Sequence, residues 1–421
     1  MVKQQKRITI IREFLGDFMN NIEVKVVIGA NYGDEGKGLA THYFAAEAKK
    51  AHRKCLNILF NGGPQRGHTV ELQDGTRHVF HHFGAGTFDG ADTYFDRNFM
   101  VNPMMFMAER DELVKLGYSQ NKVCISPECR VITPYDMICN QIIENNRANR
   151  HGTCGQGIWE TQCRYENSEF NKLYKDLINF TPGRLKCYLK RLRSVYVPRR
   201  LKGIEIPYDY EELLESDSLV DVYVNDFFAM AAHTNMVSFD CFSTRDGFHF
   251  PYETIIFEAG QGLGLDEDNF SERPHVTASS TTSKYPTIFC KRNQLDNVEI
   301  CYVTRSYLTR HGEGQLTTEC RKDSINAEMV DLTNVPNPHQ GTLRYGYFSY
   351  KTMYRIHIDR LEHPWSYNHS IMITHLNETN YQIKEPDMNS EVNKLLKFVD
   401  KGYLSDSPFS EDILTTYCKK E

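Results

Sequence analysis

Short runs of apolar residues, each followed by a glycine-rich turn, recur along the chain and predict buried strands. The first covers residues 24–29 and the second covers residues 56–60, and the stretch between them has a helical composition up to residue 50. A strand, a helix and another strand in succession are typical of a parallel sheet with helices on its faces. Later apolar runs predict further strands at residues 254–258, 298–303 and 370–374.

The remaining segments predict how the chain is organised around this sheet. We expect an α/β fold with a large, mostly parallel central sheet, helices on both faces, a P-loop-like turn after the first strand, and helical insertions. The main domain would span residues 23–384, after a short amphipathic extension at residues 1–22. We further expect helices at residues 111–116 and 135–147, a helical insertion at residues 165–250, and a polar, peripheral C-terminal segment at residues 385–421.

The composition limits the classes of protein to consider. The chain has 421 residues and a net charge of −6, which argues against a protein that coats nucleic acid. Its twelve cysteines are dispersed without a CxxC pair, which favours a reducing cytoplasm over a disulfide framework. Charged residues interrupt the apolar stretch 8–18 and no long apolar run occurs, so we expect neither a secretory signal nor a membrane span.

The turn after the first strand, Gly33-Asp34-Glu35-Gly36-Lys37-Gly38, has the features of a phosphate cradle. Its glycines let backbone N–H groups point at an anion, and Lys37 adds a positive charge. The spacing differs from the common P-loop, Gly-x-x-x-x-Gly-Lys-Ser/Thr. Asp34 and Glu35 lie inside the turn, and a carboxylate beside phosphates is unfavourable unless it meets a metal ion or accepts a substrate proton. An ordinary strand-to-helix turn is the alternative.

The turn after the second strand, residues 61–70, contains His68. Because its ordinary pKa is near 6.5, His68 can hold a proton at neutral pH and act as a general acid. A single histidine in a turn is more often structural. However, the carboxyl ends of parallel strands meet at one edge of a sheet, so Asp34 and Lys37 are expected beside His68, which favours the functional role.

Later glycine-rich or hydroxyl-rich stretches suit contacts with a phosphate or a sugar. A hydroxyl-rich turn can donate hydrogen bonds to phosphate oxygens, although it can equally be an ordinary serine-threonine loop. These stretches are residues 151–157 with Thr153 and Cys154, residues 257–262 with Gln261, residues 276–282 with Thr277, and residues 309–314.

Taken in chain order, the motifs resemble those of the adenylosuccinate synthetase family. The resemblance extends over roughly residues 24–380, and its first two motifs are the most specific. The matching motifs are Gly33-Asp-Glu-Gly-Lys-Gly38, Gly62-Gly-x-x-x-Gly-His-Thr69, Gly152-Thr-x-Gly-x-Gly157, Phe257-Glu-x-x-Gln-Gly262, Val276-Thr-x-Ser279 and Thr309-Arg-x-Gly-x-Gly314.

This resemblance implies a ligase that joins the amino group of aspartate to C6 of a 6-oxopurine monophosphate, IMP by default. A nucleoside triphosphate first phosphorylates O6, and the amine then displaces that phosphate. The resemblance also implies Mg²⁺ as cofactor, a homodimer, small-molecule substrates, and no direct contact with nucleic acid or membrane.

The resemblance assigns roles to individual residues. Asp34 matches the base that deprotonates the purine N1, His68 matches the acid, and Lys37 would stabilise the moving phosphoryl group. Mg²⁺ would be held partly by Asp34 and the backbone of Gly67. The nucleotide and phosphate cradle would include Gly33, Glu35, Gly36, Gly38 and Thr69, and the purine monophosphate would contact Gln65, Thr153, Cys154, Gln261 and Thr277.

Several positions depart from the family pattern and leave the substrates open. Gln65 and Cys154 replace an Asn and a Thr beside the nucleotide substrate. Asn377 replaces the aspartate that recognises the guanine of GTP, and since an amide can pair with adenine, ATP or dATP is at least as good a donor. In the amino-acid loop, which includes Thr342, only Arg344 remains of an arginine-rich run, which puts aspartate in question.

This combination is similar to a phage-type branch of the family that aminates dGMP, uses ATP, and supplies 2-aminoadenine for viral DNA. Those enzymes replace the loop aspartate by a smaller residue, whereas this chain keeps Asp34, so both substrate choices stay open. A non-ligating nucleotide-binding paralogue and a phosphotransferase without amine attack are further alternatives. For the arginine that reaches the substrate phosphate of a neighbouring subunit in such homodimers, Arg164 is the nearest candidate.

Overall fold

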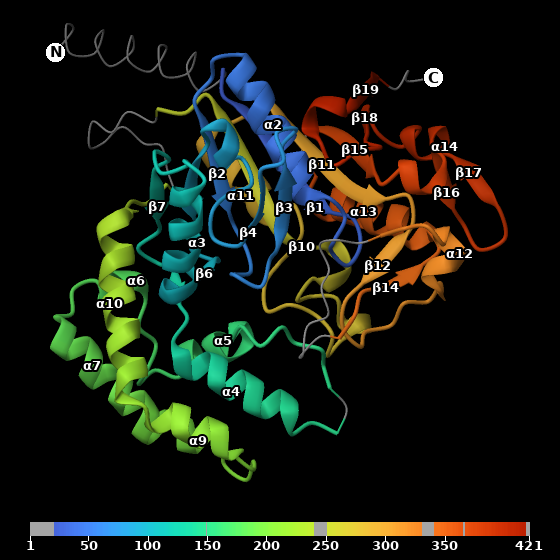
Figure 1. Cartoon of the computed structure of the whole chain (residues 1–421). Coiled ribbons are helices and arrows are strands. Elements are labelled where there is room, and N and C mark those ends of the chain that lie inside the picture. Colours follow the sequence, from blue (N-terminus) through green and yellow to red (C-terminus); the bar gives the residue numbers. More distant parts are fainter. Residues whose placement is uncertain (1–20, 149, 240–250, 331–340, 365–366, 418–421) are drawn as a thin grey trace, which may run out of the picture.

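A ten-stranded sheet forms the centre of the molecule (Figure 1). The computed structural model describes residues 21–148, 150–239, 251–330, 341–364 and 367–417. Neighbouring strands are parallel except for β18 and β19, which confirms the predicted fold class. In sheet order the strands are β19 (Leu414–Tyr417), β18 (Lys401–Leu404), β15 (Asn368–Thr374), β11 (Val298–Arg305), β1 (Glu23–Gly29), β10 (Thr254–Gly262), β2 (Cys55–Leu59), β5 (Asp92–Phe95), β7 (Val123–Ile125) and β9 (Asn235–Met236).

Helices cover both faces of the sheet because alternate residues of its central strands point to opposite sides. Val27 of β1 packs with Phe44 of α2 (Lys37–Lys50) on one face. Val26 packs on the other face with Phe289 of α11 (Lys284–Asn293) and Ile356 of α13 (Tyr350–Glu362). Each face therefore has its own apolar layer, as expected for a sheet buried on both sides.

The helices between residues 103 and 233 pack against the β5–β7 end of the sheet and share one apolar core with it. They include the predicted insertion at residues 165–250, of which residues 240–250 lie outside the described part of the chain. That core joins Phe95 of β5 to Phe106, Ile138, Leu185 and Phe227 of four helices, and Figure 1 shows the helices as a separate layer beside the sheet. The helices of this region are α3 (Pro103–Lys115), α4 (Pro134–Asn145), α5 (Ile158–Glu166), α6 (Tyr174–Leu177), α7 (Pro182–Arg191), α8 (Val197–Arg200), α9 (Tyr208–Glu215) and α10 (Asp217–His233).

Short two- and three-stranded ribbons frame the carboxyl edge of the central sheet. Small elements complete these loops, namely α12 (Lys322–Asn326), α14 (Asn393–Leu396) and several single 3₁₀ turns. The ribbons are β3 (His68–Glu71) with β4 (Arg77–Phe80), β6 (Met100–Val101) with β8 (Arg130–Val131), β12 (Leu308–Arg310) with β14 (Arg344–Gly346) and β13 (Glu319–Cys320), and β16 (Gln382–Lys384) with β17 (Asn389–Glu391).

Two segments differ from the sequence-based expectation. Residues 260–262 were expected to form a turn, but β10 continues to Gly262, because a Cβ there would lie 2.5 Å from the Asn31 carbonyl oxygen and only glycine permits this approach. The polar C-terminal segment contributes β18 and β19 at one edge of the central sheet, with Tyr403 fully buried. The predicted N-terminal extension lies almost entirely outside the described residues.

Candidate active site

The loop between β1 and α2 brings the first motif to the carboxyl edge of the sheet. Gly33, Asp34 and Gly36 all have positive φ angles, of 107°, 58° and 94°. Glycine is required at position 36, because a Cβ there would lie 2.9 Å from a methyl carbon of Thr374 on β15. The tight loop therefore leads directly into the N-terminus of α2, and the N-terminus of a helix favours a bound anion.

Glu35 stabilises this loop from the inside. Its carboxylate is buried and accepts a hydrogen bond from the backbone N–H of Asn31, and it lies 3.7 Å from the Nζ atom of Lys37. Burial raises the pKa of Glu35, and the Lys37 ammonium acts in the opposite direction. The side chains of Glu35 and Lys37 thus form a buried pair under the loop, and Glu35 has only its backbone to offer to a phosphate.

His68 lies in a buried network of charged side chains at the start of β3. Its Nδ1 atom is 2.5 Å from Oε1 of Glu258 on β10, and the same oxygen accepts a hydrogen bond of 2.5 Å from Arg66. The other carboxylate oxygen accepts from the backbone N–H of Ala85 at 3.1 Å. Arg66 and Glu258 have no exposed side-chain surface, so their geometry is fixed by packing as well as by hydrogen bonds.

The protonation state of His68 differs from the sequence-based expectation. Burial, together with the neighbouring Arg66 cation, lowers the pKa of His68 to about 3, so the unliganded imidazole is neutral at pH 7. Its Nε2 atom is buried and has no hydrogen-bond partner among the described residues. A negative charge placed beside Nε2 would favour the protonated form, so His68 becomes an acid only when an anionic ligand is present.

Asp34 lies on the open side of the loop, and its side chain is 24% exposed. Its Oδ2 atom is 3.7 Å from Nε2 of His311, in the motif that follows β12. Hydrogen bonds fix the backbone on either side, from Arg305 to the Asp34 carbonyl at 2.5 Å and from Thr309 to the Gly33 carbonyl at 3.3 Å. His68 packs against the first turn of α2, since a Cβ on Gly38 would be 3.1 Å from the His68 Cβ.

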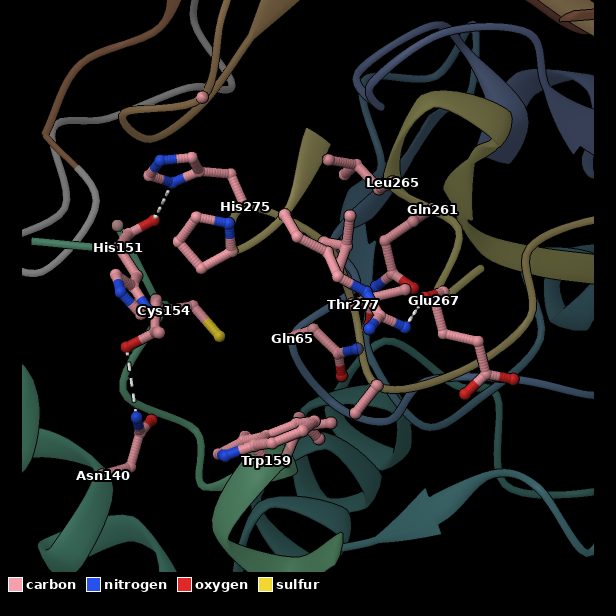
Figure 2. A pocket seen from close by; sticks show the side chains of 18 of the residues that line it. Gln65, Asn140, His151, Cys154, Trp159, Gln261, Leu265, Glu267, His275 and Thr277 are labelled. Carbon is pink, nitrogen blue, oxygen red and sulfur yellow. Dashed lines mark hydrogen bonds between the residues drawn. The ribbon is translucent and has the colours of Figure 1, made fainter. Parts of the chain in front are cut away.

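A cavity of about 640 Å³ opens beside this edge of the sheet (Figure 2). All of the residues predicted to contact the purine monophosphate line it, namely Gln65, Thr153, Cys154, Gln261 and Thr277. His311, which contacts Asp34, also lines it. The cavity therefore joins five of the six sequence motifs, although they lie far apart in the chain, from Gln65 to Gly314.

Gln65 and Gln261 face each other across one wall of the cavity (Figure 2). Both side chains converge over Gly62, where a Cβ would lie 2.8 Å from Nε2 of Gln65 and 3.0 Å from Oε1 of Gln261. Both polar atoms of Gln65 and Oε1 of Gln261 are buried without a partner among the described residues. Buried amides are normally hydrogen-bonded, so this wall is suited to a polar, planar ligand such as a purine base.

The opposite wall is formed by the third motif, and Figure 2 shows the Cys154 sulfur pointing into the cavity. Burial raises the pKa of this thiol to about 11, so it stays protonated at neutral pH and is a poor nucleophile. The loop packs backbone to backbone against the His311 loop, because a Cβ on Gly152 would lie 2.6 Å from the Cα atom of Gly312. Thr153 is oriented by Asn140, which donates to its hydroxyl at 3.2 Å.

The predicted donor and amino-acid residues lie outside this cavity. Asn377 is exposed at the start of a 3₁₀ turn after β15, close in sequence to Thr374, whose hydroxyl donates to the Glu35 carbonyl at 2.9 Å. Thr342 is exposed. Arg344 forms a fork with Glu319, with distances of 2.9 Å and 2.5 Å, and donates to the carbonyls of Gly312 and Gly314, so a substrate carboxylate would compete with Glu319.

Arg164 cannot act as an arginine that reaches a neighbouring subunit. Its guanidinium is buried and binds Asp136 through Nε at 2.8 Å and the Val131 carbonyl through a terminal nitrogen at 2.6 Å. These bonds fasten α5 to α4, so withdrawing Arg164 would leave Asp136 buried without its partner. The expected homodimer stays a prediction without an assigned arginine.

Comparison with known proteins agrees with the motifs. The family model described as adenylosuccinate synthetase matches residues 26–337, which is well over half of the chain. The chain belongs to the adenylosuccinate synthetase family.

Individual members of the adenylosuccinate synthetase family are similar at modest identity. The enzyme of Francisella tularensis is 28% identical over 314 residues, covering 72% of this chain and 67% of its own, and that of Prochlorococcus marinus is 29% identical over 311 residues, covering 73% and 66%.

Two solved structures share the adenylosuccinate synthetase fold. The fully ligated adenylosuccinate synthetase of Plasmodium falciparum superposes with a TM-score of 0.67 at 16% identity, covering 94% of this chain and all of the other. The succinoaminodeoxyadenylate synthetase of cyanophage S-2L, bound to dGMP and to dATP as energy donor, superposes with a TM-score of 0.60 at 14% identity, covering 94% and 95%.

The magnesium ion implied by the adenylosuccinate synthetase family fits the oxygen atoms available here. Asp34 offers a partly exposed carboxylate, and Gly67, in an exposed turn, offers a backbone carbonyl. Within the described part of the chain, no group of three or more His, Cys, Asp or Glu side chains is arranged to hold a metal ion. Mg²⁺ is commonly bound by one or two carboxylates together with substrate phosphates, so this donor set suits it.

None of the described helices is long and apolar enough to cross a membrane.

Sequence analysis missed three residues that shape this adenylosuccinate synthetase site. Glu258 and Arg66 orient His68, and His311 contacts Asp34. A signal was present for Glu258, because a carboxylate inside an otherwise apolar strand must be paired when buried. Arg66 and His311 lie within quoted motifs but have no sequence pattern that indicates their partners.

Proposed function

We propose that this protein is a nucleoside-triphosphate-dependent ligase that joins the amino group of aspartate to C6 of a 6-oxopurine monophosphate, with IMP as the default substrate. The observation that supports this most directly is the position of Asp34 and His68. Asp34 lies in the loop that leads into α2, and His68 packs against Gly38 at the start of that helix. Asp34 contacts His311, which lines a cavity whose Gln65 and Gln261 amides lack partners among the described residues. A protein that only binds nucleotides has no need of a base and a latent acid together.

In the proposed reaction Asp34 accepts the N1 proton of the purine, which makes O6 nucleophilic. O6 then attacks the terminal phosphorus of the nucleoside triphosphate, so that an O6–P bond forms while the bond to the leaving diphosphate breaks. Lys37 and the His68 Nε2 atom stabilise the charge on the transferred group. Mg²⁺, when bound, neutralises charge on the phosphates.

In the second step the aspartate amine forms the C6–N bond, and O6 leaves with the phosphate. Arg344 is the cation proposed to bind the amino-acid substrate, and it must exchange the Glu319 carboxylate for that of the substrate. A phosphotransferase that stops after the first step is the second candidate, because the occupied Arg344 favours it. For the first step, dGMP or GMP with ATP or dATP is the rival substrate pair, since Gln65, Cys154 and Asn377 depart from the family pattern at the nucleotides.

One experiment separates these possibilities. The full chain is incubated with Mg²⁺, aspartate, either ATP, dATP or GTP, and IMP, GMP or dGMP in turn, and the products are identified by mass spectrometry. We expect a succinyl purine nucleotide, whose mass names the monophosphate. Phosphorylation or phosphate release without a succinyl product would select the phosphotransferase, and binding without turnover would select a nucleotide-binding paralogue.

A further inference from the structure

Trp159 is the exposed residue in a buried stretch at the start of α5. The residues on both sides, Gly157, Ile158, Glu160 and Thr161, are buried, whereas 53% of the Trp159 surface is exposed. A tryptophan normally gains most from being covered, since its ring has a large apolar surface. The position therefore suggests that a ligand covers it.

The neighbours of Trp159 fix its direction toward the cavity. Ile158 packs on Gly63, where a Cβ would lie 2.6 Å from its Cδ1 atom, and Gly63 belongs to the turn that contains Gln65. On the next residue, Glu160 forms a fork with Arg200, with distances of 2.6 Å and 2.9 Å. With both neighbours held inward, Trp159 lines the cavity, and Figure 2 shows its indole along the wall below Gln65.

Charged groups of both signs line the cavity. Glu267 lies on the side of Gln65 and Gln261 (Figure 2), where Arg273 donates a hydrogen bond of 2.8 Å to its backbone carbonyl, so the charges alone do not orient a ligand. Cys154, His151 and His275 lie on the opposite side, together with the hydroxyl and backbone groups of the third motif. The unpartnered amide atoms of Gln65 and Gln261 are therefore the groups that favour a base on their side of the cavity.

We propose that Trp159 stacks on the purine base of the monophosphate substrate while Gln65 and Gln261 hydrogen-bond its edge. An indole face and two amides are a combination that binds a flat, polar-edged ring, and base–aromatic stacking contributes substantially to affinity. The inference rests on the proposed function for the identity of the ligand. It assigns the base, and not the ribose or the phosphate, as the part that Trp159 contacts.

The fluorescence of Trp159 provides the test, because the chain has only two tryptophans, Trp159 and Trp365. In the full-length Trp365→Phe variant, IMP, GMP and dGMP are titrated separately, with UMP and ribose 5-phosphate as controls. We expect saturable quenching by at least one purine monophosphate and none by ribose 5-phosphate. Trp159→Ala should raise the Kd of that monophosphate roughly tenfold to a hundredfold, measured by calorimetry, and Trp159→Phe by only a few-fold.

Tyr354→Ala serves as a matched control, because Tyr354 is 59% exposed on α13 and does not line the cavity. It should leave the Kd unchanged. If calorimetry shows purine binding but Trp159 fluorescence and the Trp159→Ala affinity do not change, the stacking role is wrong while the proposed function stands. If no purine monophosphate binds at all, both proposals are wrong. Equal quenching by ribose 5-phosphate would also overturn the assignment to the base.

Discussion

The two sides of the site differ in how their polar groups are satisfied. Around His68, Glu258 and Arg66 are completely buried and joined by contacts of 2.5 Å. Across the cavity wall, Gln65 and Gln261 hold amide atoms without partners among the described residues. In the first group the charges are already paired with one another without a ligand, although Nε2 of His68 and two nitrogens of Arg66 have no partner among the described residues. In the second group the amides would obtain partners only when a ligand binds.

This difference separates two kinds of expected effect. The groups proposed to move protons are held in advance by the protein, so changing them should lower turnover and, where charges are buried, stability as well. Groups that select the ligand obtain their partners from it, so changing them should alter affinity and leave the fold intact. The variants below test this division, beginning with the proton-transfer side.

The largest effect is expected for Asp34→Asn. Asparagine tolerates the positive φ angle of 58° at this position and removes only the proton acceptor. We expect kcat to fall by about 10³-fold, within the usual range for a general base, with a normal melting temperature. A near-normal rate of product formation by this variant would show that Asp34 is not the base.

Glu258→Gln should lower both turnover and stability. It leaves Arg66 buried without a counter-charge, and we expect a loss of about 3 kcal/mol in the free energy of unfolding, measured by urea denaturation. It also removes the negative charge beside Nδ1 of His68 and leaves a neutral amide there, so kcat should fall about 100-fold and its pH profile should shift. Arg66→Met with Glu258→Gln is the control, since removing both charges should recover stability but not turnover. Recovery of full turnover by this double variant would contradict the role of Glu258.

Acid should destabilise the protein through His68. The pKa of His68 is about 3 in the folded chain and near 6.5 in the unfolded one, so between these values the unfolded chain binds the additional proton. Stability should therefore be full above about pH 6.5 and fall by up to about 1.4 kcal/mol per pH unit as the pH decreases toward 3. Denaturation curves from pH 7 to pH 4.5 should show a shallower decline for His68→Gln. Parallel declines would show that His68 does not titrate in this way.

On the ligand-selecting side, Gln65→Ala should reduce affinity without affecting the fold. Loss of one or two hydrogen bonds to a ligand predicts a rise of about tenfold in the Kd of the purine monophosphate. Thermal unfolding without ligand should be unchanged, because the Gln65 amide has no partner to lose. A marked drop in unliganded stability would mean that Gln65 is part of the fixed side of the site.

The smallest effect is expected for Asn377→Asp, at an exposed position after β15. A carboxylate accepts both N–H groups of guanine and repels the acceptor edge of adenine. We expect the ratio of kcat/KM for GTP to that for ATP to rise about fivefold, as for one altered hydrogen bond at an exposed site. An unchanged ratio would show that residue 377 does not contact the donor base.

The central architecture could be predicted because its determinants are local. Apolar runs such as residues 24–29 and 298–303 indicate which strands are buried, and the glycine turns after such strands indicate where ligands are expected to bind. The end of β10 was missed because Gly260 and Gly262 resemble a turn in sequence. The need for glycine at position 262 depends on the Asn31 backbone, which approaches from the loop after β1.

The pairing of charges could not be predicted. Arg66, Arg164 and Arg344 are equally plausible ligand contacts in the sequence, yet each is bound by a carboxylate of its own chain, Glu258, Asp136 and Glu319 respectively. These partners are between 25 and 192 residues away, so no local spacing indicates them. The same holds for the neutral state of His68, which results from burial and from Arg66.

The contact between Gly152 and Gly312 has a mechanical consequence. Because no side chain separates the two backbones, neither loop can shift toward the other without displacing it. One loop borders the cavity at Cys154, and the other holds His311 against Asp34. A ligand that displaces the Cys154 loop would therefore also displace the His311 loop and, through His311, the side chain of Asp34. Ligand binding in the cavity and the alignment of Asp34 would then occur together.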